Sequence, residues 1–335
     1  MSMGHHHQLD RQRVISAYAV VALHVCAFYV TGAPVGGAAW WAANIIDSAL
    51  RWCVPFFVMI TGALLLPKLE SGVSLRAFYW RRAALLVPFA FWIGAYLAYH
   101  AIAKNLLLGG VYDIGAAIAA LWYQPPHYHL WYLYMIVPLL LLAPLLARLK
   151  PLGLWAGLLL LLPAALWFLQ LSGDLPRTPL LLRFLEFMGY LLAGHWLFRA
   201  RQSKAIRLAA LLAIAAWGFI AYFTQQHCLQ SACRFSPYYD YHGPLVVVLS
   251  LSLFVIALSC LPNHQSRVTA LLNPLALGIF LIHPVFIDLG FALMPPESAP
   301  LWALPLMMLA AAGLSTAAAW VLSRIPYLRR VIQLR

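Results

Sequence analysis

The chain has 335 residues, of which 64% are hydrophobic and only 9% charged, and its formal net charge is +13. An ordinary soluble domain carries about a quarter charged residues, so this composition excludes a protein that faces water on all sides. The mean hydropathy of +0.83 and the recurring apolar blocks, each near the roughly 20 residues needed to cross a bilayer, predict an all-α polytopic membrane protein.

Apolar segments recur along the chain in an order that predicts about ten transmembrane helices. The expected spans are 13–30, 45–67, 83–103, 128–147, 152–171, 180–198, 207–225, 244–261, 271–294 and 301–323. The polar start MSMGHHHQLD is not typical of a cleavable signal peptide. No long or charged linker separates the spans, so residues 1–335 are expected to form one integral membrane domain, with 1–12 as a cytoplasmic tail.

The basic residues indicate how this multi-pass chain is oriented. Ten spans place both termini on one side of the membrane, together with 17 of the 22 Lys and Arg residues. The other five are Arg51, Lys104, Arg177, Arg183 and Arg234. Positive charge gathers on the cytoplasmic side of membrane proteins, so both termini are expected to be cytoplasmic. The net charge is therefore interpreted as topology and contact with anionic membrane lipids, not as nucleic-acid binding.

Two outer connections contain features of their own. The segment VYDIGAAIAALWYQ at 111–124 is too short to span and predicts a helix lying along the interface. Cys228 and Cys233 in CLQSAC form a small disulfide if the compartment on the outer side of the membrane is oxidising, and remain free thiols if it is not.

The first span begins on an arginine and carries a histidine, in RVISAYAVVALH from Arg13 to His24. Eleven helical steps bring the second side chain to within about 20° of the first, about 16 Å further along the axis. Arg13 then lies at the cytoplasmic rim and His24 near the bilayer midplane. Ionisable groups inside a span usually line a site, which favours a functional role for His24. The alternative is a structural hydrogen bond to a neighbouring helix.

Further polar residues are expected at a similar depth in the membrane or in its outer half. Asp47 and Arg51 stand four positions apart in the second span and can pair. Glu186, His195 and His283 are the other candidates. His283 also precedes Asp288 with the H-x4-D spacing of glycerolipid acyltransferases. Five helical steps separate these side chains by about 140°, so the match is interpreted as chance.

Aromatic residues gather in two outer stretches, WYQPPHYHLWYLY at 122–134 and SPYYDYH at 236–242. Either they form the interfacial belt that membrane proteins share, or they form a platform for a sugar ring. Trp131 with Asp240 and with His127 or His129 among these rings favours the platform.

Several catalytic motifs are absent from the sequence. There is no G-x-S-x-G, no H-E-x-x-H and no P-loop. A soluble-type serine hydrolase, a zinc protease and an ATPase are therefore not supported, and no metal site is expected.

The chain resembles the acyltransferase 3 family of integral membrane acyltransferases over nearly its whole length. Asp10 and Arg13, followed by ten residues and His24, resemble its R-x10-H hallmark. Four further blocks are similar in order: RWCVPFFVMITGALLLP at 51–67, RRAALLVPFAFW at 81–92, HLWYLYMIVPLLLLAPLL at 129–146 and LGIFLIHPVF at 277–286. Val14 and Thr61 depart from the family pattern, where a glycine and a serine are usual.

Within the family the chain looks most like the bacterial surface-polysaccharide O-acetyltransferases, in particular those that modify enterobacterial common antigen, partly because of YDYHGPLVVVLSLSLF at 239–254. This resemblance implies a bacterial inner-membrane enzyme. It also implies acyl-CoA as donor, most often acetyl-CoA, and as acceptor a hydroxyl of a surface glycan or its lipid-linked precursor.

The resemblance and the residues together suggest roles for individual side chains. The phosphates of cytoplasmic coenzyme A are expected to meet Arg13, Arg81 and Arg82. His24 is expected to act as a general base on the sugar hydroxyl, or to carry the acyl group itself. The candidates for stabilising the oxyanion or contacting substrate are Arg51, Thr61, His129, Trp131, Glu186, Asp240 and His283.

The sequence is also compatible with other functions. A transporter or flippase of polysaccharide or lipid-linked sugar would also carry charges near the membrane midplane. Within the family, transfer of another acyl group such as succinyl, or acylation of a small molecule, are further alternatives.

Overall fold

The computed structural model describes residues 6–107, 110–172, 178–200, 205–231 and 236–333, and within these ranges its regular structure is helical throughout. The all-α prediction is confirmed. The helices are α1 (His7–Gly32), α2 (Ala38–Leu50), α3 (Cys53–Glu70), α4 (Leu75–Ala83), α5 (Leu86–Ile102), α6 (Ile114–Ala120), α7 (Trp131–Leu146), α8 (Leu152–Leu171), α9 (Phe184–Ala200), α10 (Ile206–Ser231), α11 (Pro244–Cys260), α12 (Arg267–Leu272), α13 (Ala276–Leu293), α14 (Ala303–Ser323) and α15 (Pro326–Ile332).

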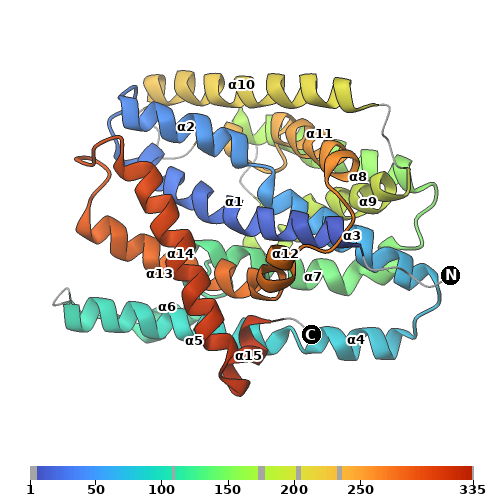
Figure 1. Cartoon of the computed structure of the whole chain (residues 1–335), viewed down its shortest axis with the longest axis horizontal. Coiled ribbons are helices and arrows are strands. Elements are labelled where there is room, and N and C mark those ends of the chain that lie inside the picture. The colour runs from blue at the N-terminus through green and yellow to red at the C-terminus, as the bar shows by residue number, and fades with distance from the viewer. Residues whose placement is uncertain (1–5, 108–109, 173–177, 201–204, 232–235, 334–335) are drawn as a thin grey trace.

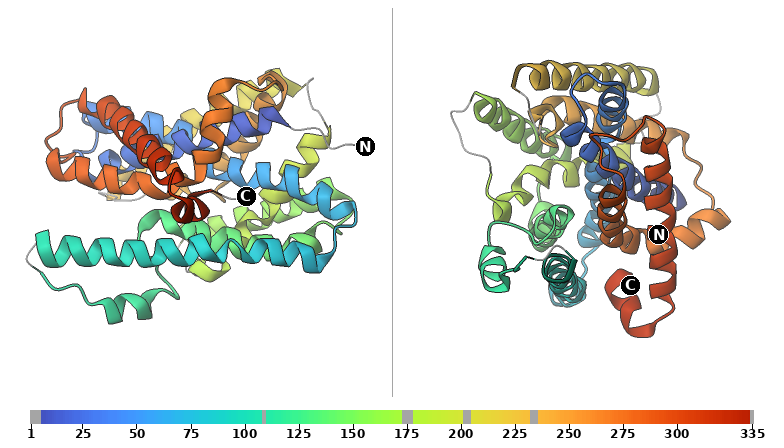
Figure 2. Two further views of the ribbon diagram at one scale, coloured as in Figure 1. Left: turned by 60° about the horizontal axis from the view of Figure 1, so that its bottom comes forward. Right: turned by 90° about the vertical axis from the view of Figure 1, so that its left-hand side faces the viewer.

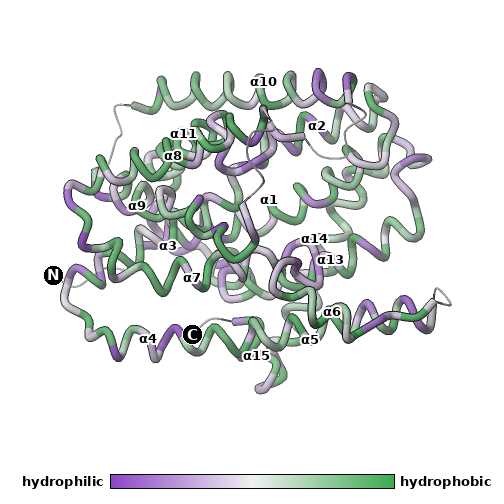
Figure 3. Tube along the Cα trace, turned by 180° about the vertical axis from the view of Figure 1, so that it is seen from behind, coloured by the Kyte–Doolittle hydropathy of each residue, from purple (hydrophilic) through white to green (hydrophobic). Residues whose placement is uncertain are grey.

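In the described part of the chain, ten helical segments are long and apolar enough to cross a membrane, from His7–Gly32 to Ala303–Ser323. They correspond one to one with the ten predicted spans. Figure 3 shows that hydrophobic residues dominate these helices. The first helix begins at His7, so part of the expected tail belongs to α1. The cytoplasmic placement of the termini stays a prediction.

Two of the predicted spans are interrupted where the sequence analysis expected continuous helices. The second divides into α2 and α3 at Arg51 and Trp52, and the third into α4 and α5 at Ala84 and Leu85. Each break lies four residues before a proline, Pro55 in one case and Pro88 in the other. A proline has no N–H to donate to the carbonyl four residues back, and its ring clashes with that carbonyl. The break at Arg51 places its side chain inside the bundle, where it is 5% exposed.

Close approach of α3 and α9 depends on two glycines. A Cβ added to Gly62 would lie 1.9 Å from the carbonyl oxygen of Leu191, and one added to Gly194 would lie 2.1 Å from that of Met59. Small residues at helix crossings let membrane helices pack backbone against backbone. The crossing fixes α3 at the centre of the bundle.

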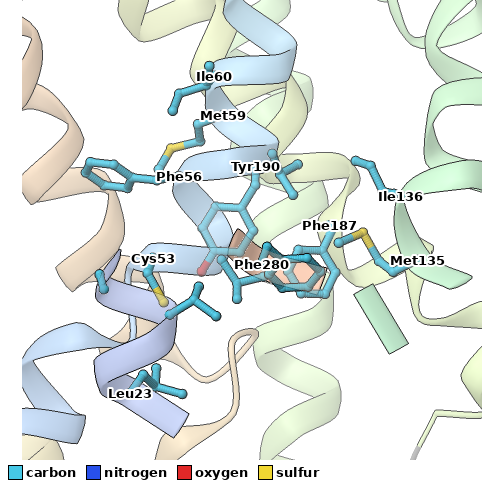
Figure 4. Close-up of a cluster of buried hydrophobic side chains, with 14 of the residues drawn as sticks. Leu23, Cys53, Phe56, Met59, Ile60, Met135, Ile136, Phe187, Tyr190 and Phe280 are labelled. Carbon is cyan, nitrogen blue, oxygen red and sulfur yellow. The ribbon is translucent and has the colours of Figure 1, made fainter. Parts of the chain in front are cut away.

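The centre of the bundle is formed by α1, α3, α7, α9 and α13. Their spans are more than half buried, whereas less than a third of the residues are buried in the spans containing α4–α5, α8, α10 and α14. Figure 1 shows α10 along one edge and α4 and α5 along the opposite edge. Figure 4 shows apolar side chains of the five central helices meeting around Tyr190 and Phe280. The candidate site lies among these central helices.

The first outer connection contains the predicted short helix, and the second is described in part. A short helix, α6, forms within 111–124 and lies at the end of the bundle opposite the N-terminus (Figures 1 and 2). The carboxylate of Asp113 caps it by accepting from the N–H of Ala116 at 2.9 Å. Cys228 is buried and disulfide-bonded, while Cys233 lies outside the described residues.

Candidate active site

A cavity of about 950 Å³ opens among α1, α3, α4, α5, α7, α12, α13, α14 and α15. Its described lining contains no Asp or Glu side chain. It contains five cations instead: Arg13, Lys68, Arg82, Arg324 and Arg329. Most of the remaining lining is apolar, including Leu64, Ile136 and Val137. A lining of several cations and many apolar side chains suits a ligand that has a polyanionic head and a long thin arm.

Arg13 is held in place at this cavity by Asp10 of its own helix and by Asn273, which lies far along the chain. Its Nη1 donates to Asn273 Oδ1 at 3.2 Å and lies 3.5 Å from Asp10 Oδ1, which also accepts from Asn273 Nδ2 at 3.0 Å. The Arg13 side chain is 33% exposed, so the guanidinium is anchored and still reaches the cavity. Asn273, which is 260 positions from Arg13, was not identified by the sequence analysis.

The deep end of the cavity is a wall of aromatic rings. Phe57, Tyr132 and Phe280 line it, with ring centroids 6.1 Å apart between the first two and 5.3 Å between the last two. Behind the wall, the Phe280 ring contacts the His129 ring at 5.5 Å and the His283 ring at 5.9 Å. One ring therefore separates the cavity from a group of histidines.

His24 belongs to this histidine cluster, which we define as His24, His127, His129 and His283. The rings of His24 and His283 stack with centroids 5.2 Å apart and planes at 19°. His129 meets His283 edge-on at 5.5 Å, and Tyr128 lies 4.8 Å from His24. His283 and His129 are buried, whereas His24 is partly exposed. Two sequence-predicted residues, His129 and His283, are thus brought beside the predicted catalytic histidine.

The hydrogen bonds of His283 indicate which of its ring nitrogens carries the proton. Nδ1 lies 3.3 Å from the carbonyl oxygen of Ile279, which can only accept, so Nδ1 donates. In a neutral ring Nε2 then bears the lone pair. That nitrogen is buried and has no hydrogen-bond partner among the described residues. It can accept a proton or a hydrogen bond from a substrate group.

Arg51 and Asp47 form the ion pair that their spacing predicts. Arg51 Nη2 donates to Asp47 Oδ2 at 2.5 Å, and its guanidinium carbon lies 3.8 Å from the centre of the Tyr239 ring. Both charged side chains are buried. This placement neutralises a large part of the arginine charge, so its role toward an oxyanion stays a prediction.

Removing one member of this pair should destabilise the protein. We expect Asp47→Ala to lower the free energy of unfolding by about 3–5 kcal/mol, because the Arg51 guanidinium loses its buried partner. The double variant Asp47→Ala/Arg51→Met, which removes both charges, should recover most of the loss. Thermal unfolding in detergent checks both. Equal midpoints for Asp47→Ala and the wild type would contradict the expected coupling.

The outer aromatic stretches form a packed cluster. Trp131 stacks on Tyr241 with centroids 5.6 Å apart, and the guanidinium of Arg183 lies 5.3 Å from the Trp131 ring. Nearby, Glu186 Oε2 lies 3.5 Å from His242 Nδ1, with both side chains buried. Ring faces of Trp131 are covered by protein groups in this arrangement. Its use as a sugar platform, and that of the half-buried Asp240, remain predictions.

The remaining predicted site residues lie at different distances from the cavity. Thr61 lines it and donates its hydroxyl to the carbonyl oxygen of Phe57 at 2.7 Å. Arg81 is exposed and is not among the lining residues, unlike Arg82. His195 lies elsewhere, 3.3 Å from Glu70, which also pairs with Lys150 and Arg199. None of these four residues is among the cavity-lining residues.

The structure also adds residues that sequence reasoning missed. Lys68, Arg324 and Arg329 join the cationic lining, and Tyr128 joins the histidine cluster. Asp288 does not pair with His283, in agreement with the chance interpretation, but its Oδ2 lies 3.1 Å from His127 Nε2. The H-x4-D spacing could not predict the contact between Asp288 and His127, because this contact joins α13 to a loop 161 positions away.

These features define a class of protein: a polytopic helical membrane protein with an internal site for an anionic ligand beside a histidine cluster. The chain belongs to the acyltransferase 3 family, since the family model Acyl_transf_3, described as an acyltransferase domain, matches residues 6–324. The family recognised from five sequence blocks is confirmed, and the protein is a membrane acyltransferase that takes an acyl donor and an acceptor. No curated protein and no solved structure matched the chain.

Proposed function

We propose that the protein transfers an acetyl group from cytoplasmic acetyl-CoA to a hydroxyl of a cell-surface glycan, or of its lipid-linked precursor, in the bacterial inner membrane. The observation that carries the proposal is the cavity, whose described lining has five cations and no Asp or Glu, and which one ring separates from the histidine cluster that contains His24. Coenzyme A matches this shape, with phosphates for the cations and a thin arm for the apolar walls.

The chemistry assigned to His24 follows from its position. The acceptor hydroxyl attacks the thioester carbon, and His24 removes the hydroxyl proton as the C–O bond forms and the C–S bond breaks. The proton then neutralises the departing thiolate, which leaves as free thiol. An acyl-histidine intermediate divides the same transfer into two steps. Rapid quenching of the enzyme with labelled acetyl-CoA distinguishes the two, because only the second labels the protein.

The central experiment follows thiol release from acetyl-CoA by purified protein in nanodiscs, with a cell extract containing surface glycans as acceptor. Thiol release with acetylation of a glycan supports the proposal. Glycan or lipid-linked sugar movement without acetyl-CoA consumption would instead support the transporter alternative, which the family match disfavours. Replacing acetyl-CoA with succinyl-CoA, or the glycan with small hydroxyl compounds, tests the remaining choices of donor and acceptor.

Neutral substitution of Arg82 tests the donor site. We expect Arg82→Gln to raise the KM for acetyl-CoA by about tenfold with little change in kcat, because one charge-assisted phosphate contact of roughly 1.5–3 kcal/mol is lost far from the reacting bond. Arg148→Gln is the matched control, since Arg148 is exposed and is not a lining residue. Steady-state kinetics measures both. An unchanged KM in Arg82→Gln would remove Arg82 from the donor site.

A further inference from the structure

A hydrogen-bonded chain leads away from the histidine cluster and has no role in the proposed function so far. Asp288 Oδ2 lies 3.1 Å from His127 Nε2, and His127 Nδ1 lies 3.3 Å from His129 Nδ1. His127 and His129 are buried, at 5% and 1% exposure, whereas the Asp288 side chain is 24% exposed. These hydrogen bonds thus connect an accessible carboxylate to the interior of the bundle.

The Asp288 carboxylate determines which ring nitrogens of His127 and His129 carry a proton. An ionised carboxylate can only accept, so His127 donates through Nε2 and, as a neutral ring, accepts at Nδ1. His129 then donates through Nδ1 and presents the lone pair at Nε2. That nitrogen is buried without a hydrogen-bond partner among the described residues, as is Nε2 of His283 beside it. Buried histidines with a purely structural role normally satisfy both ring nitrogens.

A shared metal ion does not account for these nitrogens. No three His, Cys, Asp or Glu side chains in the described ranges are placed to hold one. What the nitrogens have in common is the ability to accept a proton. They belong to His283, which stacks on His24, and to His129, whose ring contacts that of His283.

We propose that Asp288, His127 and His129 form a proton relay for acyl transfer, an inference that rests on the function proposed above. When His24 has taken the hydroxyl proton, the proton passes from the His24–His283 pair to Nε2 of His129. The Nδ1 proton of His129 moves to Nδ1 of His127, and the Nε2 proton of His127 moves to the carboxylate of Asp288. The steps reverse when a proton neutralises the thiolate of the departing donor, so the reaction remains one hydroxyl plus one thioester giving one ester plus one thiol.

Other ionisable side chains surround Asp288, His127 and His129. Tyr99 donates to the same Asp288 oxygen at 3.1 Å, and the rings of Tyr96 and His100 pack against His127 at 4.5 and 5.2 Å. Tyr128 lies against His127 and His24. Tyr96 and Tyr128 also contact the His129 ring, but in the described ranges the hydrogen bond between His127 and His129 is a direct one between their Nδ1 atoms.

The test replaces the carboxylate by a group of the same shape that cannot take up the proton. We expect Asp288→Asn to lower kcat by about tenfold or more, with the KM for acetyl-CoA unchanged. Its solvent deuterium isotope effect on kcat should rise, because proton transfer becomes the slow step. Asp288→Glu should recover part of the rate. Asp113→Asn is the matched control, because Asp113 caps α6 through a hydrogen bond to Ala116, outside the histidine cluster.

The outcomes separate this inference from the proposed function. If the wild type releases thiol and Asp288→Asn matches Asp113→Asn in kcat and in isotope effect, the relay is overturned and the function stands. If the wild type releases no thiol with acetyl-CoA and the glycan extract, both are overturned. Should Asp288→Asn not be recovered folded, His127→Gln takes its place with the same expected losses, because its amide cannot conduct a proton.

Discussion

Replacing His24 with alanine should lower kcat for acyl transfer by about 10²–10⁴-fold, the range that a positioned general base contributes. His24 is the one member of the histidine cluster that is partly exposed, and it stacks on His283 beside the end of the cavity. It is not among the cavity-lining residues. The variant should therefore bind acetyl-CoA with an affinity close to that of the wild type, so that the loss is confined to the chemical step.

Tyr18→Phe is the control for this experiment. Tyr18 lies on the same helix and shares a hydroxyl hydrogen bond with Thr316 of α14 at 2.8 Å, away from the cluster. We expect it to retain wild-type turnover within a factor of about two, because the loss of a single partly exposed hydrogen bond changes stability by only about 1 kcal/mol. Turnover of His24→Ala equal to that of Tyr18→Phe would remove His24 from the reaction. Thermal unfolding of both variants shows that a loss of rate is not a loss of fold.

The ten spanning helices of this fold could be predicted from the sequence alone. Ten apolar stretches of spanning length predict ten helices, since the bilayer imposes a length and a polarity on each. The spacing from Arg13 to His24 likewise predicts one helix face, because it depends only on helical geometry. The breaks at Arg51 and Ala84 could also have been predicted from the prolines four residues later. The apolar pattern alone did not indicate them.

Contacts between distant segments could not be predicted in this way. Asn273 supports Arg13 across 260 positions, and Asp288 reaches His127 across 161. Both contacts depend on how α13 and the short elements before it pack against α1 and α7, and no spacing within one helix encodes that packing. The wall formed by Phe280 is likewise a tertiary feature, although His283 was recognised one turn away.

Gly194→Ala should be among the most destabilising small substitutions in the protein. The added Cβ would lie 2.1 Å from the carbonyl oxygen of Met59, and backbone atoms of α3 cannot move aside as a flexible side chain can. Overpacking of this kind costs about 1–3 kcal/mol, and occasionally more. We expect a lower midpoint of thermal unfolding in detergent and a smaller folded fraction on size-exclusion chromatography. Activity should also fall, because Thr61 and Lys68 of the displaced helix line the cavity.

Gly218→Ala provides the contrast, since a Cβ at that position on α10 meets nothing within 4 Å. Alanine favours a helix by roughly 1 kcal/mol over glycine, so this variant should be neutral or slightly more stable. The same chemical change then has opposite signs at the two sites. Gly62→Ala acts on the same α3–α9 crossing as Gly194→Ala, and once the helices have separated for one methyl group the second costs less. The double variant should therefore lose less stability than the two single losses added together, and strict additivity would show that the two glycines do not share one crossing.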